Sequence, residues 1–184
     1  MINQTNIFAD FQKVEAVSKN IQAEYVNNIP NSMMTLWNEY GFGSCIDGYL
    51  KIINPREYQD ILEESYVRYD SAIPLVTTAM GDIIVWEKNK YLNLLNFRRG
   101  TVKVIESGFE FFLEDIEDEN FLIEELDWNP YKEASKKFGN PAYDECFGYI
   151  PLLALGGSDK VENLKKVKLR EHILLITALT GAIE

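Results

Sequence analysis

Few side chains in this sequence could carry a proton, attack a substrate or bind a metal. Its one histidine, His172, stands in the apolar run REHILLITAL, where an imidazole is more often a packed core group than a catalyst. The cysteines, Cys45 and Cys146, lack metal-ligand spacing and have apolar neighbours. We therefore predict no catalytic residue, no metal site and no cofactor.

Carboxylates are plentiful, and two of them lie beside glycines at predicted turns. Asp47 occurs in CIDGYL and Asp82 in MGDIIVW. Asp next to Gly is typical of tight turns, which favours a structural role. An enzyme that uses the two as an acid–base pair stays open as an alternative, and it predicts that both line one pocket.

The stretch CFGYIPLLALGG, residues 146–157, ends in paired glycines that could cradle a phosphate. A phosphate loop needs wider glycine spacing and a Lys-Ser/Thr pair at the start of a helix, and the following SDKVEN offers neither. We predict instead a buried strand, an irregularity at Pro151 and a turn at Gly156 and Gly157.

The chain has 184 residues and a formal net charge of −11. Such an acidic chain repels phosphate backbones, so we predict no direct nucleic-acid binding. The plain interpretation of the charge is that it keeps the protein soluble, and the functional one is that it steers a basic protein partner toward the chain. The N-terminus lacks the pattern of a signal peptide, and no segment is long enough to span a bilayer. We expect a cytoplasmic protein without a membrane partner.

The acid excess is concentrated in EDIEDENFLIEELD, residues 114–127. A solvated helical face is the plain interpretation, and a docking surface for a basic protein is the functional one. Two tryptophans near predicted turns could be exposed and anchor such an interface. The predicted partner-binding residues are Glu114, Asp115, Glu117, Asp118, Glu119, Glu124, Glu125, Asp127, Trp86 and Trp128.

Hydrophobic periodicity places these residues in an α+β fold. We predict a small antiparallel sheet in the middle of the chain, flanked by N- and C-terminal helices, in one domain over 1–184 with a seam near 114–127. The predicted helices cover 7–25, 31–40, 54–66, 108–128, 129–138 and 169–180, and the predicted strands cover 49–53, 73–79, 83–88, 90–97, 101–106 and 146–155.

Four blocks of the sequence resemble the GAD-like domain family, in which type VI secretion immunity proteins are found. They are IPNSMMTLWNEYGFGSCIDGYLKIINPREY, TTAMGDIIVW, CFGYIPLLALGG and ENLKKVKLREHILLI, in that order along nearly the whole chain. Met80 departs from the pattern, where a Phe is expected before Gly-Asp.

The resemblance implies a bacterial cytosolic protein that neutralises a co-encoded toxin, commonly a nuclease. It implies no catalytic residues and a single GAD-like immunity-type domain. Our first hypothesis is that the protein binds the toxin and occludes its active site or substrate groove. Two other hypotheses stay open, namely a non-enzymatic scaffold or regulatory binding protein and, as the weaker one, the enzyme that uses Asp47 and Asp82.

Overall fold

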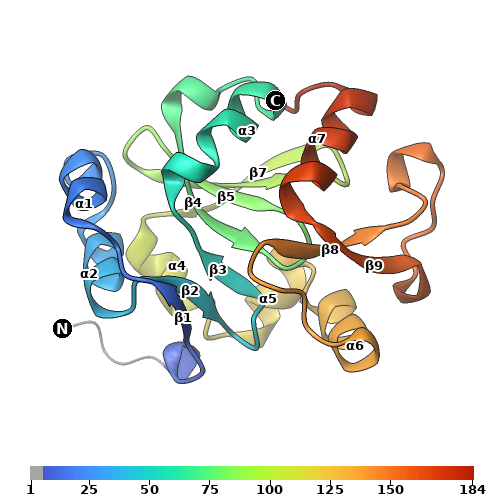
Figure 1. The fold of residues 1–184 in the computed structure, drawn as a ribbon, viewed down its shortest axis with the longest axis horizontal. Helices are drawn as coiled ribbons and strands as arrows, with labels where there is room; N and C mark the ends of the chain where they lie inside the picture. The colour runs from blue at the N-terminus through green and yellow to red at the C-terminus, as the bar shows by residue number, and fades with distance from the viewer. Residues whose placement is uncertain (1–5) are drawn as a thin grey trace.

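A seven-stranded antiparallel sheet is the frame on which the helices pack (Figure 1). The structure, a computed structural model, describes residues 6–184. Each strand pairs with the next one along the chain. The strands are β1 (Gln12–Glu15), β2 (Phe42–Cys45), β3 (Leu50–Ile52), β4 (Ala72–Thr78), β5 (Ile83–Glu87), β6 (Tyr91–Asn96) and β7 (Thr101–Ser107). Short turns join β2 to β3 and each successive pair from β4 to β7, whereas helices lie between β1 and β2 and between β3 and β4.

The sheet is large and begins near the N-terminus, so the prediction of a small sheet in the middle of the chain is wrong. The predicted helix over 7–25 is also wrong, because that segment holds a 3-10 turn, strand β1 and only a short helix α1 (Lys19–Tyr25). Strand β1 pairs with β2, which lies far along the chain, and local spacing cannot show such a pairing. Val14, which a helix over 7–25 would place on its apolar face with Ile7, Phe11 and Ile21, is exposed on β1.

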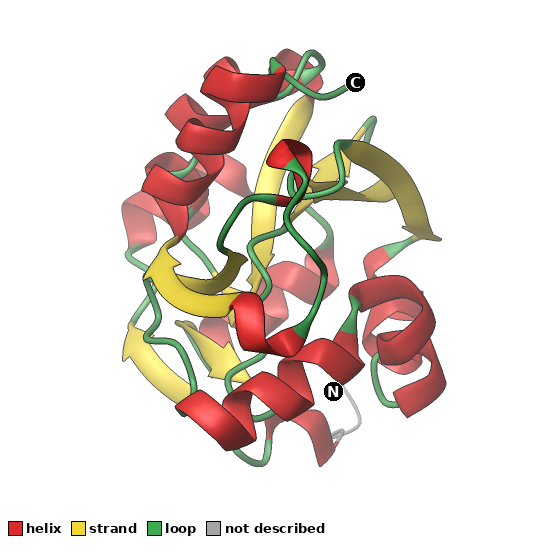
Figure 2. Cartoon of the chain, turned by 90° about the vertical axis from the view of Figure 1, so that its right-hand side faces the viewer, coloured by secondary structure: helices red, strands yellow, loops and turns green. Residues whose placement is uncertain are grey.

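Helices cover both faces of the sheet, as Figures 1 and 2 show. On one face lie α3 (Gln59–Ser65) and α7 (Leu169–Thr180), and on the other lie α2 (Asn31–Glu39), α4 (Phe109–Asp115), α5 (Glu119–Leu126) and α6 (Trp128–Phe138). The α+β prediction is confirmed. Within residues 6–184, no helix is long and apolar enough to cross a bilayer.

Strand β5 shows why the central strands are apolar at almost every position. Ile83 and Val85 pack in the core beneath α3 and α7, whereas Ile84 and Trp86 pack in the core on the opposite face. Successive side chains of a strand point to opposite faces, so a sheet covered on both sides buries all of them.

A second, two-stranded sheet of β8 (Glu145–Tyr149) and β9 (Leu164–Lys168) joins the large one at its side. The Phe147 amide donates a 2.7 Å hydrogen bond to the Ala79 carbonyl, and buried Lys51 of β3 donates one of 2.7 Å to the Ala142 carbonyl. Burial lowers the pKa of Lys51 to about 8. The buried strand predicted over 146–155 is right only in its first part, because β8 ends at Tyr149 and residues 153–155 form a 3-10 turn. The predicted chain reversal follows at Gly156, whose φ is 82°.

Candidate functional site

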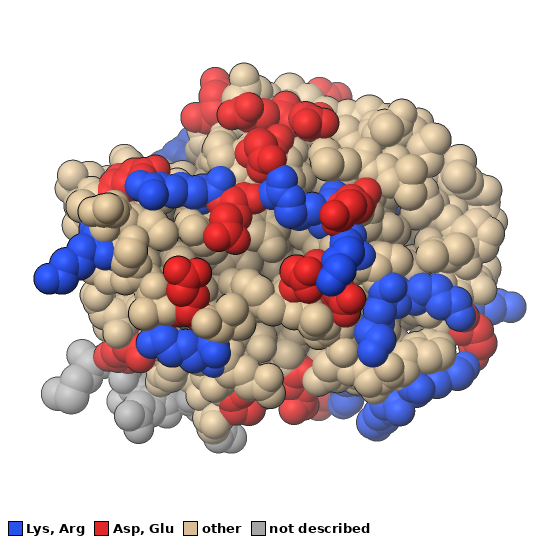
Figure 3. Space-filling view, in the orientation of Figure 1, with Lys and Arg blue, Asp and Glu red and all other residues tan. Residues whose placement is uncertain are grey.

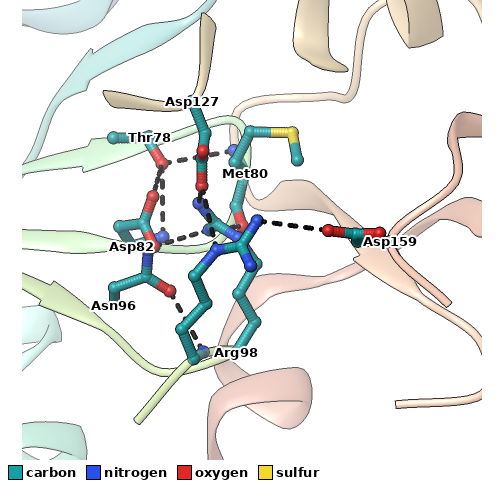
Figure 4. A network of polar contacts seen from close by, with 8 residues as sticks. Thr78, Met80, Asp82, Asn96, Arg98, Asp127 and Asp159 are labelled. Carbon is teal, nitrogen blue, oxygen red and sulfur yellow. Dashed lines mark hydrogen bonds and ion pairs between the residues drawn. The ribbon is translucent and has the colours of Figure 1, made fainter. Parts of the chain in front are cut away.

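A buried cation, Arg98, lies at the centre of the densest polar network in the described chain (Figure 4). Its Nη1 donates 2.6 Å hydrogen bonds to the Asp82 carboxylate and to the Met80 carbonyl. Its Nη2 pairs with Asp127, the residue that follows α5. The Thr78 hydroxyl donates a 2.8 Å hydrogen bond to the other oxygen of Asp82. Arg98 therefore joins the β4–β5 turn to the end of the acidic stretch.

Burial and ion pairing act against each other in this network. Burial raises the pKa of Asp82, and Arg98 and Thr78 oppose that shift. Burial also acts to raise the pKa of Asp127, but Arg98 and Arg99 outweigh it and hold that pKa below its usual value. Asp127 thus remains a carboxylate that compensates a buried guanidinium. Its role in the described structure is structural, which the sequence did not indicate.

Asp47 and Asp82 have different surroundings. Asp82 is fully buried in the Arg98 network, whereas Asp47 is exposed at the β2–β3 turn with a φ of 54°. The prediction of one pocket lined by both side chains is therefore wrong. Asp47 instead lines a groove of about 380 Å³ with Asp10 and Glu117, which we call the acidic groove.

His172 and the two cysteines are packed core groups. His172 is buried on α7, and burial together with nearby Arg98 lowers its pKa. A Cβ on Gly148 would lie 2.5 Å from the imidazole, so only glycine lets β8 approach this ring. Burial raises the pKa of Cys146 to about 12, which leaves it protonated at neutral pH. Among the described residues, no three His, Cys, Asp or Glu side chains gather where they could hold a metal ion.

The acidic stretch folds as two short helices, α4 and α5, joined by residues 116–118, and we call residues 109–126 the acidic helix pair. Three of its predicted partner-binding residues have cationic or capping contacts: Glu119 pairs with Lys132, Glu125 pairs with Lys103, and Asp118 accepts the Asn120 amide at the start of α5. Asp115 is half-buried. Glu114, Glu117 and Glu124 are exposed, with no ion pair within residues 6–184.

The two predicted aromatic anchors are not exposed. Trp86 and Trp128 are each only 6% exposed, because both belong to the core beneath the helices. Their positions near turns suggested exposure, and the sequence alone does not show the packing that covers these two side chains. The exposed aromatic of this region is Phe111 on α4, at 56%, between buried Phe109 and Phe112. Helical spacing within FEFF, residues 109–112, could have indicated it, since Phe111 follows Phe109 by two residues and so points to the other side of the helix.

Comparison with known proteins gives family matches in both parts of the chain. A family model described as "GAD-like domain" matches residues 3–96, half of the chain, and one described as "T6SS immunity protein Tdi1, C-terminal" matches residues 106–180. The crystal structure of Atu4351 from Agrobacterium tumefaciens is similar, with a TM-score of 0.74 and 20% identity over 92% of this chain and 86% of that chain. That likeness shows the fold. No curated protein matches the chain.

Proposed function

The chain belongs to the GAD-like domain family, and from that premise we propose that it is a cytoplasmic immunity protein that binds and neutralises a type VI secretion toxin. The observation that carries the proposal is the match of residues 106–180 to a type VI secretion immunity domain. That segment contains the acidic helix pair. The proposed role is to bind the toxin rather than to modify it chemically.

The acidic helix pair is the proposed docking surface, and its charge fits a nuclease. An enzyme that cleaves nucleic acid presents a basic groove to the phosphate backbone. The exposed carboxylates of Glu114, Glu117 and Glu124 offer that groove a competing set of negative charges. Opposite charges on the two proteins speed their encounter, so the toxin is captured quickly. A protein seated in this way occludes the active site.

The acidic groove is a specific position at which carboxylates of this chain could bind a basic side chain of the toxin. Asp10, Asp47 and Glu117 reach it from three separate segments, and a volume of about 380 Å³ admits a long basic side chain. The Asp10 carboxylate is held in place, because it accepts the backbone amides of Ile46 and Asp47 at 3.1 and 2.6 Å. We propose that a lysine or arginine of the toxin enters here.

Phe111 supplies the apolar part of the proposed contact. Interfaces gain most of their affinity from a few large side chains that become fully desolvated, with aromatic residues prominent among them. Phe111 is exposed among the acids of α4, so it is accessible to a partner drawn in by charge. This residue takes the place of Trp86 and Trp128 in the proposal.

Co-expression tests the proposal directly. The product of the gene adjacent to the one encoding this chain is expressed alone, with this chain, and with a variant whose Glu114, Glu117 and Glu124 are all lysine. We expect toxicity alone, full rescue by the natural chain and weakened rescue by the variant. A neighbour that is harmless alone, or that stays toxic beside the natural chain, contradicts the immunity function. Full rescue by the variant contradicts the acidic docking surface only.

A further inference from the structure

Two uncharged segments of the sequence meet on one face of the molecule. Residues 146–158 and 172–183 contain no Asp, Glu, Lys or Arg, although a quarter of the chain is charged. They face each other across a groove of about 370 Å³ lined by Leu153, Ala154, Thr180 and residues 97–100, which include the cations Arg98 and Arg99. Figure 3 shows this region at the upper right as a broad area free of charged side chains.

Helix α7 is apolar on the side that faces solvent as well as on the side that faces the core. Ile173 and Ile176 pack inward, whereas Leu175 and Leu179 are 52% and 50% exposed. The exposed pair has a spacing of four residues, so both side chains lie on one stripe beside exposed Ala178. Beyond its first turn, which holds Arg170 and Glu171, α7 has no charged residue. An exposed leucine pair on such an uncharged stretch of helix indicates that a partner covers it.

Across the groove from α7, Leu155 projects from the 3-10 turn that follows β8 and is 63% exposed. We call Leu155, Leu175, Ala178 and Leu179 the uncharged face. A projecting leucine and a groove lie next to each other here. A surface of this kind can complement a copy of itself, because a two-fold axis brings the projection of each subunit to the groove of the other.

The distribution of charge on the chain indicates which partner binds the uncharged face. A basic toxin is drawn to the acidic helix pair, whereas the uncharged face has no carboxylate of its own and carboxylates such as Asp159 and Glu171 only at the ends of its two segments. A second copy of the chain carries the same net charge of −11 and is repelled by acidic surface. The uncharged face is where two such chains can approach with few carboxylates opposite one another. We propose that this chain forms a two-fold dimer through the uncharged face, with α7 of one copy packed against α7 of the other.

The proposed dimer is weak and responds to salt in a distinctive way. Stable interfaces bury about 800 Å² on each partner, and a single helix stripe with one neighbouring turn is at the small end of that range. Dissociation in the micromolar range follows from this. Salt screens the repulsion between two acidic copies without weakening apolar contact, so the dimer strengthens as salt rises. Toxin binding through the acidic helix pair has the opposite dependence.

Sedimentation velocity of the full chain alone tests the dimer, from about 1 to about 200 μM and in low and high salt. We expect the weight-average sedimentation coefficient to rise with concentration and with salt. Leu175→Glu with Leu179→Glu should leave a monomer throughout. Val14→Glu with Val104→Glu is the matched control, since these valines are equally exposed elsewhere and the charge change is the same. The control should dimerise as the natural chain does.

Three results would overturn the proposal: a natural chain that stays monomeric at every concentration, a control that loses the dimer as completely as the leucine variant, or a leucine variant that keeps the dimer. If the leucine variant instead loses toxin binding while the natural chain is monomeric, the toxin occupies this face. Because the assay contains no toxin, a failed dimer leaves the immunity function untouched. Circular dichroism of the leucine variant checks that it is folded.

Discussion

The acidic helix pair and the uncharged face both expose apolar side chains, yet their surroundings differ in charge. Phe111 lies among carboxylates, whereas Leu175 and Leu179 lie in a segment with no charged residue. An exposed apolar surface indicates that a partner binds there, and the charge of the surrounding surface indicates which kind of partner it is. The first region suits a basic protein, and the second suits another acidic chain. The comparison therefore supports a different proposed partner for each of the two regions.

Arg98 connects the two regions, and its loss should have the largest effect. It lines the groove beside the uncharged face and pairs with Asp127 at the end of the acidic helix pair. Arg98→Ala leaves the fully buried Asp82 without its cation, which should lower the free energy of unfolding by about 3–5 kcal/mol. Urea denaturation measures this. A loss below about 1 kcal/mol would show that the network is not structural.

Charge reversal on the acidic helix pair should have the next largest effect. Replacing Glu114, Glu117 and Glu124 by lysine should slow toxin association about 10- to 1000-fold at low salt, because steering is lost. The matched control reverses three exposed acids of the α3 region, Glu63, Glu64 and Asp70. Stopped-flow or surface-based binding kinetics measures the rate at which each of the two variants associates with the toxin. Equal slowing in both variants would mean that net charge matters and the acidic helix pair does not.

Phe111→Ala separates the apolar contribution from the charge. We expect dissociation of the toxin to quicken about 30-fold, corresponding to about 2 kcal/mol, with the association rate nearly unchanged. Because the side chain is mostly exposed, the free energy of unfolding should change by less than about 0.5 kcal/mol. An unchanged dissociation rate would remove Phe111 from the interface.

The two ends of the acidic stretch should respond oppositely to neutralisation, although both effects are small beside the others. Burial and neighbouring Glu106 raise the pKa of Asp115, so the native state holds its proton more tightly and stability falls as pH rises through that pKa. Asp115→Asn should thus stabilise the fold by a few tenths of a kcal/mol at pH 7, and the gain should vanish in acid.

Neutralisation of Asp127 should change the free energy of unfolding in the opposite direction. Its pKa is lowered in the folded chain, so its contribution is present above the unfolded value near 3.9 and is lost as pH falls through the folded one. Asp127→Asn should destabilise at pH 7. Urea denaturation of both variants across pH 3–7 measures the contrast, and a shared sign would contradict the assignment of Asp127 to the Arg98 network.

The sequence predicted the central meander well, because turns such as MGD and RRG separate short runs of branched and aromatic residues. The sequence-based prediction failed where a strand pairs with a segment that is distant along the chain. The apolar spacing around strand β1 is typical of an amphipathic helix, and the segment is a strand because it pairs with β2. Strand β9, LKKVK, was missed because three lysines in five residues conceal a short edge strand.

The candidate site was predicted in part. The concentration of carboxylates in 114–127 can be read from the sequence, but the exposure of each side chain depends on packing. Trp86 is covered because β5 is enclosed on both faces, and Asp127 turns toward a guanidinium from β6–β7 that no local pattern reveals. Helical spacing within FEFF could have singled out Phe111, but its 56% exposure is established only by the packing of α4 against the core.

Hydrogen exchange of the chain with and without its purified toxin tests the central claim most directly, because it locates the contact without any substitution. The account predicts that toxin slows exchange of backbone amides in residues 109–126 and around the acidic groove, and leaves α7 unchanged at concentrations where the chain is monomeric. Unchanged exchange in residues 109–126, with protection appearing in another part of the chain, would contradict it.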